Sequence, residues 1–344
     1  MTVTPPPAVS PTPRRIRGQG WLVVPGLMAA LPALVATGLR VLPPGSERLA
    51  KAASFIPYGL LFWVPATLLL GVATLRALRH RTPGRPSLAA LSLLSIAGLA
   101  ATMVWHAPAF VADSGRAATK PLTIVSLNVA RTAKPEAVAR AAHGADVVVL
   151  VEAYVTWASS LPASFRAEFP YRAPVDAATS DRMNADVVIF SRHPIATSEP
   201  LPKSSFQQWS AVVRTPQLGP VRVVGVHPCN PYCRQGLWVD EAGRLRAWLA
   251  DHQKAMQMII AGDFNAVDDH LTMQGLYADG YRSAADLAGA GFVRTWPADR
   301  RFPPVIAIDH VLLTPGLTAT GFDTFDVPGT DHLGIRTEIA RVAT

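Results

Sequence analysis

Several apolar runs in the last two thirds of this chain end at a residue that can bind a metal ion or carry a proton. The runs are four to six residues long and rich in Val, Ile or Leu, as is typical of buried strands. The residues at or just after their ends are Asn128, Glu152, His227, Asp263 with Asn265, and Asp309. This pattern predicts a cleft formed by strand ends and the loops that follow them.

These side chains, with Asp331 and His332 further along the chain, form an oxygen-rich set. Carboxylate and amide oxygens are preferred by hard cations such as Mg²⁺ and Mn²⁺, which keep positions for water and a substrate phosphate. His227 and His332 can donate hydrogen bonds to a phosphoryl oxygen or transfer a proton near neutral pH. Zinc would require more closely spaced His and Cys ligands. The set therefore predicts metal-assisted hydrolysis of a phosphate ester or anhydride.

Helical and extended patches alternate between these residues. Residues 135–143 and 238–252 have the spacing of amphipathic helices, and residues 186–190, 211–214 and 334–339 have the composition of further strands. The alternation predicts a rigid α/β scaffold that holds the polar residues at strand ends.

Six motifs in residues 121–342 resemble those of the endonuclease/exonuclease/phosphatase (DNase I-like) superfamily. They are LTIVSLN ending at Asn128, VVVLVE ending at Glu152, VGVHP around His227, AGDFN around Asp263, residues 295–314 (TWP to IDHVLLT), and TDHL around His332. Each motif is short, but six in family order and at family-like spacing are specific. The resemblance implies a four-layer α/β sandwich of two mostly antiparallel sheets flanked by helices.

The resemblance also implies which residues hold the metal and the water. Glu152 would be the principal metal ligand, with Asn128 and Asp331 close to the metal or its waters. Asp263 would activate or orient the attacking water, and Asn265 would bind the phosphoryl group. The implied cofactor is Mg²⁺, with Mn²⁺ as an alternative.

Two histidines receive roles from the same resemblance. Asp309 would orient His332, which would face the scissile phosphate. His227 matches the second active-site histidine of the DNase I-like and sphingomyelinase-like branches, and its acidic partner is open between Asp181 and Asp186.

Other polar residues near the motifs favour structural roles. His310 follows Asp309 on the same strand, so alternation should point it away from the cleft. Cys229 and Cys233 follow His227 at a spacing that suits a small disulfide loop, which an extracytoplasmic location permits. Zinc binding with His227 and two free thiols are the alternatives.

The first third of the chain is predicted to form a membrane anchor. Residues 21–42, 52–75 and 88–110 are each longer than the roughly 18 residues that span a bilayer as a helix. We therefore expect a disordered Pro-rich tail at 1–20, a three-helix anchor at 21–112, a linker at 113–120 and the catalytic domain at 121–344.

The basic residues of the flanks indicate the orientation. Seven arginines lie before the first apolar stretch and between the second and third, against three basic residues between the first and second. This bias predicts a multi-pass bacterial membrane protein with a cytoplasmic N-terminus and an extracytoplasmic catalytic domain.

The net charge does not favour nucleic acid as a partner. The chain of 344 residues has a formal charge of +8, but residues 1–112 hold ten Lys or Arg and one acid. The remaining 232 residues hold 22 basic and 23 acidic residues, a formal charge of −1. The basic and aromatic loops with which nucleases contact DNA are not recognisable in this part.

Together these patterns predict a membrane-anchored, outward-facing phosphohydrolase. An anchor beside a bilayer favours a lipid-linked phosphate or pyrophosphate of the cell envelope as substrate, with the bilayer as partner and no protein partner expected. Three spans followed by such a domain resemble the VanJ-type teicoplanin-resistance proteins, which would connect the chain to antibiotic resistance. The alternatives are an extracytoplasmic nuclease, a sphingomyelinase-like phospholipase, and a catalytically idle receptor or scaffold.

Overall fold

The computed structural model describes residues 19–113, 115–174, 186–234 and 236–343. The chain divides into two compact units, one of Met1–Leu34 with Gly59–Ala100 and the other of Val35–Tyr58 with Ala101–Thr344. We call them the helical unit and the sheet unit. The expected disordered tail at residues 1–20 lies outside the described residues except for its last two positions.

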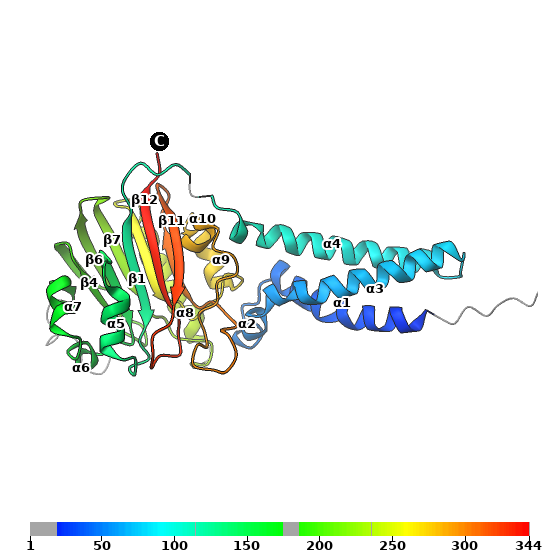
Figure 1. Cartoon of the computed structure of the whole chain (residues 1–344), viewed down its shortest axis with the longest axis horizontal. Helices are drawn as coiled ribbons and strands as arrows, with labels where there is room; N and C mark the ends of the chain where they lie inside the picture. The colour runs from blue at the N-terminus through cyan, green and yellow to red at the C-terminus, as the bar shows by residue number, and fades with distance from the viewer. Residues whose placement is uncertain (1–18, 114, 175–185, 235, 344) are drawn as a thin grey trace, which may run out of the picture. The chain divides into compact units, whose positions relative to one another are not determined.

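Within the described residues, three helices are long and apolar enough to cross a membrane. They are α1 (Gly20–Val41), α3 (Gly59–Arg79) and α4 (Arg85–Phe110) (Figure 1). In the helical unit, small residues allow close packing, because a Cβ at Gly98 would lie 2.4 Å from the Trp63 ring. Met28 and Leu68 are 71% and 63% exposed, and apolar surface of this kind favours a lipid environment.

The described part of the sheet unit contains two six-stranded sheets with a shared core. The first has the order β11 (Leu317–Phe325), β12 (Gly334–Arg341), β1 (Leu122–Asn128), β2 (Val147–Val151), β4 (Val188–Ser191) and β3 (Tyr171–Ala173). The second has the order β5 (Ile195–Pro200), β6 (Trp209–Thr215), β7 (Gly219–Val226), β8 (Met258–Asp263), β10 (Asp309–Leu313) and β9 (Arg282–Ser283). Among these strands, β1–β2 and β7–β8 are the parallel pairs, and the other neighbours are antiparallel.

The valine-rich strands are buried on both faces because each sheet lies between the other sheet and a helical layer. All five residues of β2 are buried, as expected for a continuous apolar run. Val149 and Val223 lie in the core between the sheets. Gly225 permits close approach there, because a Cβ at this position would lie 2.4 Å from Val187 Cγ1.

Helices cover the outer face of each sheet (Figure 1). The first sheet packs against α5 (Pro135–Ala142) and α7 (Ala163–Glu168), and the second against α8 (Leu237–His252) and α9 (Leu271–Ala278). The sheet unit also contains the short helices α6 (Val155–Ala158) and α10 (Ala284–Ala288). This arrangement confirms the four-layer sandwich and the two amphipathic helices expected from the sequence.

The connector after α1 belongs to the sheet unit. It forms α2 (Glu47–Ala53) and the 3₁₀ turn η1 (Ile56–Tyr58), and Ala50 is buried in the apolar cluster that contains Trp238. His270 Nε2 donates to the Ala50 carbonyl at 2.8 Å, and the Gly236 N–H donates to Glu47 at 2.7 Å. The second long helix therefore begins at Gly59, later than the expected residue 52, because residues 47–53 pack on the sheet unit.

Candidate active site

The two parallel strand pairs bring the predicted site residues together. In the first sheet Asn128 pairs with Val151, so Glu152 follows at the same edge. In the second sheet Val226 pairs with Gly262, so His227 and Asp263 emerge side by side. The antiparallel strand β10 places Asp309 opposite Asp263. Residues far apart in the sequence thus meet because both sheets end at one edge.

Asp263 lies at the centre of this group. Its carboxylate accepts hydrogen bonds from Asn128 Nδ2 at 3.1 Å and from the Asn265 N–H at 2.8 Å. The Nε2 atoms of His227 and His332 each lie 3.8 Å from Asp263 Oδ2. Burial and then the neighbouring Asp309 raise the pKa of Asp263, while the two histidines oppose this shift.

His332 and Asp309 form a buried dyad. Their Nδ1 and Oδ2 atoms lie 2.9 Å apart, and both side chains are almost fully covered. Burial lowers the pKa of His332, but Asp309, Asp263 and then Asp331 raise it to about 10. The Thr295 hydroxyl accepts the Asp309 N–H at 3.3 Å, which holds this end of β10. Asp309 thus lies beside His332, with the two side chains in hydrogen-bond contact.

His227 forms a second buried pair, with Asp186. Its Nδ1 atom makes a short contact with an Asp186 oxygen, and its ring stacks on Phe206 with centroids 4.4 Å apart. Burial lowers the pKa of His227, but Asp186 and then Asp263 raise it by more, so it lies above its ordinary value. This contact identifies Asp186 as the acidic partner, whereas Asp181 lies outside the described residues.

Glu152 and Asn128 occupy the other side of the group. Asn128 Nδ2 lies 3.3 Å from Glu152 Oε1, and Arg131 Nε lies 3.2 Å from Glu152 Oε2. Glu152 has a φ of 55°, a conformation that is uncommon for residues other than glycine and that concentrates at functional sites. No sequence motif indicated a role for Arg131, whose guanidinium also lies 4.5 Å from the centroid of the Tyr154 ring.

Asp331 and Asn265 border the site from two loops. Trp296 Nε1 donates to Asp331 Oδ2 at 3.0 Å, and Asp331 Oδ1 lies 3.8 Å from His332 Nε2. Asn265 has a φ of 49°, and its Nδ2 donates to the Pro228 carbonyl at 3.0 Å, so it links two site loops. Trp296 lies inside a quoted motif, but its contact with Asp331 was not predicted.

A cluster of side chains that could hold a metal ion is present among the described residues. One ligand atom each from Asp263, Asp309 and His332 lies within 4.8 Å of the others. Asp263 and Asp309 are 2% and 3% exposed, and a divalent cation would offset the repulsion between two desolvated carboxylates. This cluster differs from the expected ligand set of Glu152, Asn128 and Asp331, although Asn128 connects the two sets through its bonds to Asp263 and Glu152.

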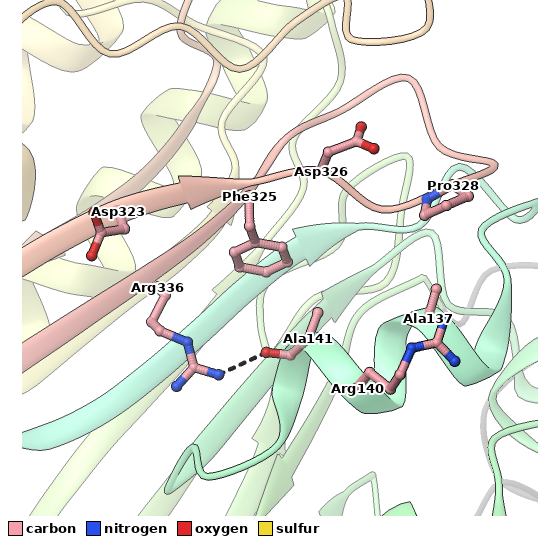
Figure 2. A pocket seen from close by; sticks show the side chains of 8 residues that line it. All are labelled: Ala137, Arg140, Ala141, Asp323, Phe325, Asp326, Pro328 and Arg336. Atoms are coloured by element: carbon pink, nitrogen blue, oxygen red, sulfur yellow. Dashed lines mark hydrogen bonds between the residues drawn. The ribbon is translucent and has the colours of Figure 1, made fainter.

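A cavity of about 540 Å³ opens beside Asp331. It is lined by Ala130, Thr132, Ala298, Asp299, Asp326, Val327, Pro328, Gly329, Thr330 and Asp331. Figure 2 shows a neighbouring cavity of about 430 Å³, where Arg336 donates to the Ala141 carbonyl at the end of α5. The two cavities share Asp326 and Pro328, and only the first is lined by a predicted site residue.

Two structural expectations are confirmed next to the site. Cys229 and Cys233 form a disulfide, with Cα atoms 6.3 Å apart, rather than a zinc site or free thiols. His310 points away from the dyad, and its Nε2 atom donates to the Ala266 carbonyl at 2.8 Å.

Comparisons with known proteins identify the family of this chain. Residues 125–332 match the model of the Endonuclease/Exonuclease/phosphatase family, and no curated protein matches the chain. A conserved protein of unknown function from Enterococcus faecalis V583 has 15% identity and a TM-score of 0.50, covering 64% of this chain and 100% of its own. An endonuclease/exonuclease/phosphatase from Beutenbergia cavernae DSM 12333 has 18% identity and a TM-score of 0.49, and the match covers 65% of this chain and 72% of that protein's chain. The family match spans the strands and loops that carry both buried histidine pairs, and this chain belongs to the endonuclease/exonuclease/phosphatase family.

Proposed function

We propose that this protein is a membrane-anchored, divalent-metal-dependent phosphohydrolase that acts on a lipid-linked phosphate or pyrophosphate. The observation that carries the proposal is the convergence of two buried Asp–His pairs on Asp263, in a chain that also has three membrane-length apolar helices. Such a site can bind a phosphoryl group and activate water, and such helices hold the enzyme beside a lipid-borne substrate.

The two histidines supply hydrogen-bond donors to the phosphoryl group. Their Nδ1 atoms face Asp309 and Asp186, so each Nε2 atom is directed toward Asp263 and the reacting phosphate. Both carboxylates favour the protonated imidazolium, which stabilises the charge that develops on phosphoryl oxygens in the transition state.

Asp263 acts on the attacking water. Its carboxylate is oriented by Asn128 and by the Asn265 N–H, and its raised pKa suits a group that accepts a proton. Asn265 binds the phosphoryl group in this proposal.

Mg²⁺ is the proposed cofactor, with Mn²⁺ as the alternative. Glu152, Asn128 and Asp331 would hold it, next to the Asp263–Asp309–His332 cluster. When bound, the ion would neutralise phosphoryl charge and lower the pKa of the attacking water.

The proposed location is a bacterial cell membrane with the sheet unit outside. The arginine bias of the flanks supports this orientation, and the disulfide supports an oxidising compartment. The VanJ-type branch, a cell-envelope substrate and a part in antibiotic resistance belong to the same proposal, and they rest on the order of three spans before this domain.

The test is phosphate release from a polyprenyl diphosphate by the detergent-solubilised full chain. We expect release with Mg²⁺, none with EDTA, and none from the Asp263→Ala variant. Absence of release by a folded, metal-binding wild type would overturn the substrate, and DNA and sphingomyelin would then separate the nuclease and phospholipase alternatives. Inactivity on all of these would favour a receptor or scaffold.

A further inference from the structure

Three residues of the sheet unit that lie at or next to the ends of the apolar helices contact loops of the same unit. Arg40 Nε, in the last turn of α1, lies 3.0 Å from Asp269 Oδ1. The Tyr58 hydroxyl, one residue before α3, donates to the Val305 carbonyl at 2.6 Å. The ring of Phe110, the last residue of α4, makes an edge contact with Phe292 at 4.8 Å. All six residues belong to the sheet unit.

These contacts locate a face of the sheet unit. The three helix ends are the ones that alternating spans place on one side of a membrane, and the ends of spans lie near the bilayer surface. Asp269, Phe292 and Val305 therefore lie near that surface if the helices span the membrane.

The same loops border the active site. The loop with Asp269 begins at Asn265, directly after the central Asp263. The loop with Phe292 and Val305 contains Trp296, which donates to Asp331, and Ala298, whose N–H donates to the Asp331 carbonyl at 2.7 Å. Along this loop, residues 299–304 alone separate Ala298, which contacts Asp331, from Val305, which contacts Tyr58.

Residues 299–305, which we call the lip, have the composition of a bilayer-contacting segment. Four consecutive residues are exposed, namely Arg300, Arg301, Phe302 and Pro303, and the exposed fraction of Phe302 is 53%. Arg300 pairs with Asp299 at 3.1 Å, which leaves Arg301 as the cation next to Phe302. A cation beside an exposed aromatic ring suits an anionic headgroup layer above acyl chains.

We infer that the lip contacts the surface of an anionic bilayer and that lipid-borne phosphates reach the active site across it. The 540 Å³ cavity runs from Ala298 and Asp299, at the base of the lip, to Asp331, which gives a headgroup a route to the site. The bilayer contact rests on the contacts above, and the substrate route rests in addition on the proposed function.

The first experiment measures bilayer contact without using activity. A nitroxide label is attached to the full-length Phe302→Cys variant in vesicles of phosphatidylcholine and phosphatidylglycerol in equal parts, and to Tyr171→Cys as the control. Tyr171 is an exposed aromatic residue on β3, and Cys229 and Cys233 are paired and do not compete for the label. We expect oxygen to relax the label at 302 more than a water-soluble nickel complex does, and the reverse at 171. If the nickel complex relaxed the label at 302 more than oxygen did, the proposed contact between the lip and the bilayer would be wrong.

The second experiment tests the route to the site. In the same vesicles, we compare hydrolysis of a long polyprenyl diphosphate with that of water-soluble geranyl diphosphate. The Arg301→Gln/Phe302→Ser variant should lower the ratio of the two rates by about five- to tenfold. The matched variant Tyr171→Ser/Arg172→Gln also replaces one aromatic residue and one arginine, on β3, and should leave the ratio unchanged.

The outcomes separate the two proposals. An unchanged ratio in the lip variant would overturn the route, while hydrolysis by the wild type would keep the proposed function. A label at 302 that enters the bilayer, in a protein that hydrolyses neither diphosphate, would support the lip and overturn the proposed function.

Discussion

His332 Nδ1 lies 2.9 Å from Asp309 Oδ2, although the two residues come from different sheets. Asp309 begins β10 of the second sheet, and His332 lies in the loop two residues before β12 of the first sheet, so the bond joins the two halves of the sandwich. The same histidine presents Nε2 toward Asp263 at 3.8 Å. The dyad therefore orients one imidazole and favours its charged form at the centre of the site.

Asp309→Asn should separate this electrostatic role from a packing role. The amide is nearly isosteric but carries no charge, so the pKa of His332 should fall from about 10 toward its ordinary value. We expect turnover to fall by roughly 10²–10⁴, the usual effect of losing a positioned acid–base group, with the free energy of unfolding changed little. Initial rates at saturating substrate and thermal unfolding measure the two quantities.

Asp323→Asn provides the matched control, because Asp323 lies on β11 away from the dyad. It should retain full turnover. If Asp309→Asn lowered stability and turnover in parallel, Asp309 would be a structural residue. Asp263→Ala and His332→Ala should behave as Asp309→Asn does.

Glu152→Gln should distinguish the two ligand sets. If Glu152 holds the cation, loss of its charge should raise the Mg²⁺ concentration for half-maximal activity by roughly 10–100-fold, while activity at saturating Mg²⁺ recovers in large part. A Mg²⁺ titration of the rate measures this, with the exposed Glu136→Gln on α5 as control. An unchanged titration would assign the ion to Asp263, Asp309 and His332 alone.

The sequence predicted the layers and the members of the site because both depend on short local patterns. Valine-rich runs that end in polar residues specify strands and a shared edge, and the other seven predicted residues contact Asp263 directly or through one another. The left-handed backbone of Glu152 has no signal in residue type, whereas Asn265 belongs to a residue type that adopts this conformation more readily. Such conformations follow from tertiary contacts.

Contacts between distant loops were not predictable either. Asp186 could be proposed only as one of two acids, because its contact with His227 depends on how the two sheets face each other. The docking of α2 was missed because Ala50 and Ala53 look like ordinary residues of an apolar stretch. The burial of Ala50 depends on His270 and Trp238, which lie about two hundred positions later.

The docking of α2 should make stability depend on pH through His270. Burial lowers the pKa of His270 to about 4, although the hydrogen bond from its Nε2 to the Ala50 carbonyl acts in the opposite direction. The Val267 N–H donates to Nδ1, which leaves the single proton of the neutral ring on Nε2. The unfolded chain binds a proton near pH 6.5 and the folded chain does not, so this contribution is complete above pH 6.5 and is lost as pH falls toward 4. We expect a loss of about 2 kcal/mol at pH 5, measured by denaturant unfolding of the full chain in detergent.

The His270→Gln variant separates the contribution of His270 to the pH dependence of stability from that of the neighbouring Asp269. Burial and Asp268 raise the pKa of Asp269 to about 7. Protonation of Asp269 therefore stabilises the folded chain as pH falls, which opposes the effect of His270. Subtracting the pH dependence of His270→Gln from that of the wild type removes the contribution of Asp269. Identical profiles for the two proteins would show that His270 is not held neutral.

Removing the disulfide should affect stability more than catalysis. His227 is held by Asp186 and by Gln208, whose Oε1 accepts the His227 N–H at 3.0 Å, and Glu241 accepts the Cys229 N–H at 2.8 Å. The Cys229→Ser/Cys233→Ser variant should therefore lose about 2 kcal/mol of unfolding free energy, the scale for closing so short a loop, and less than about tenfold in turnover. Dithiothreitol should have the same effect on the wild type and none on the variant. Both thiols should resist alkylation in the unreduced protein by mass spectrometry, and modification of either would mean that the loop is held by Glu241 and Asn265 without a covalent bond.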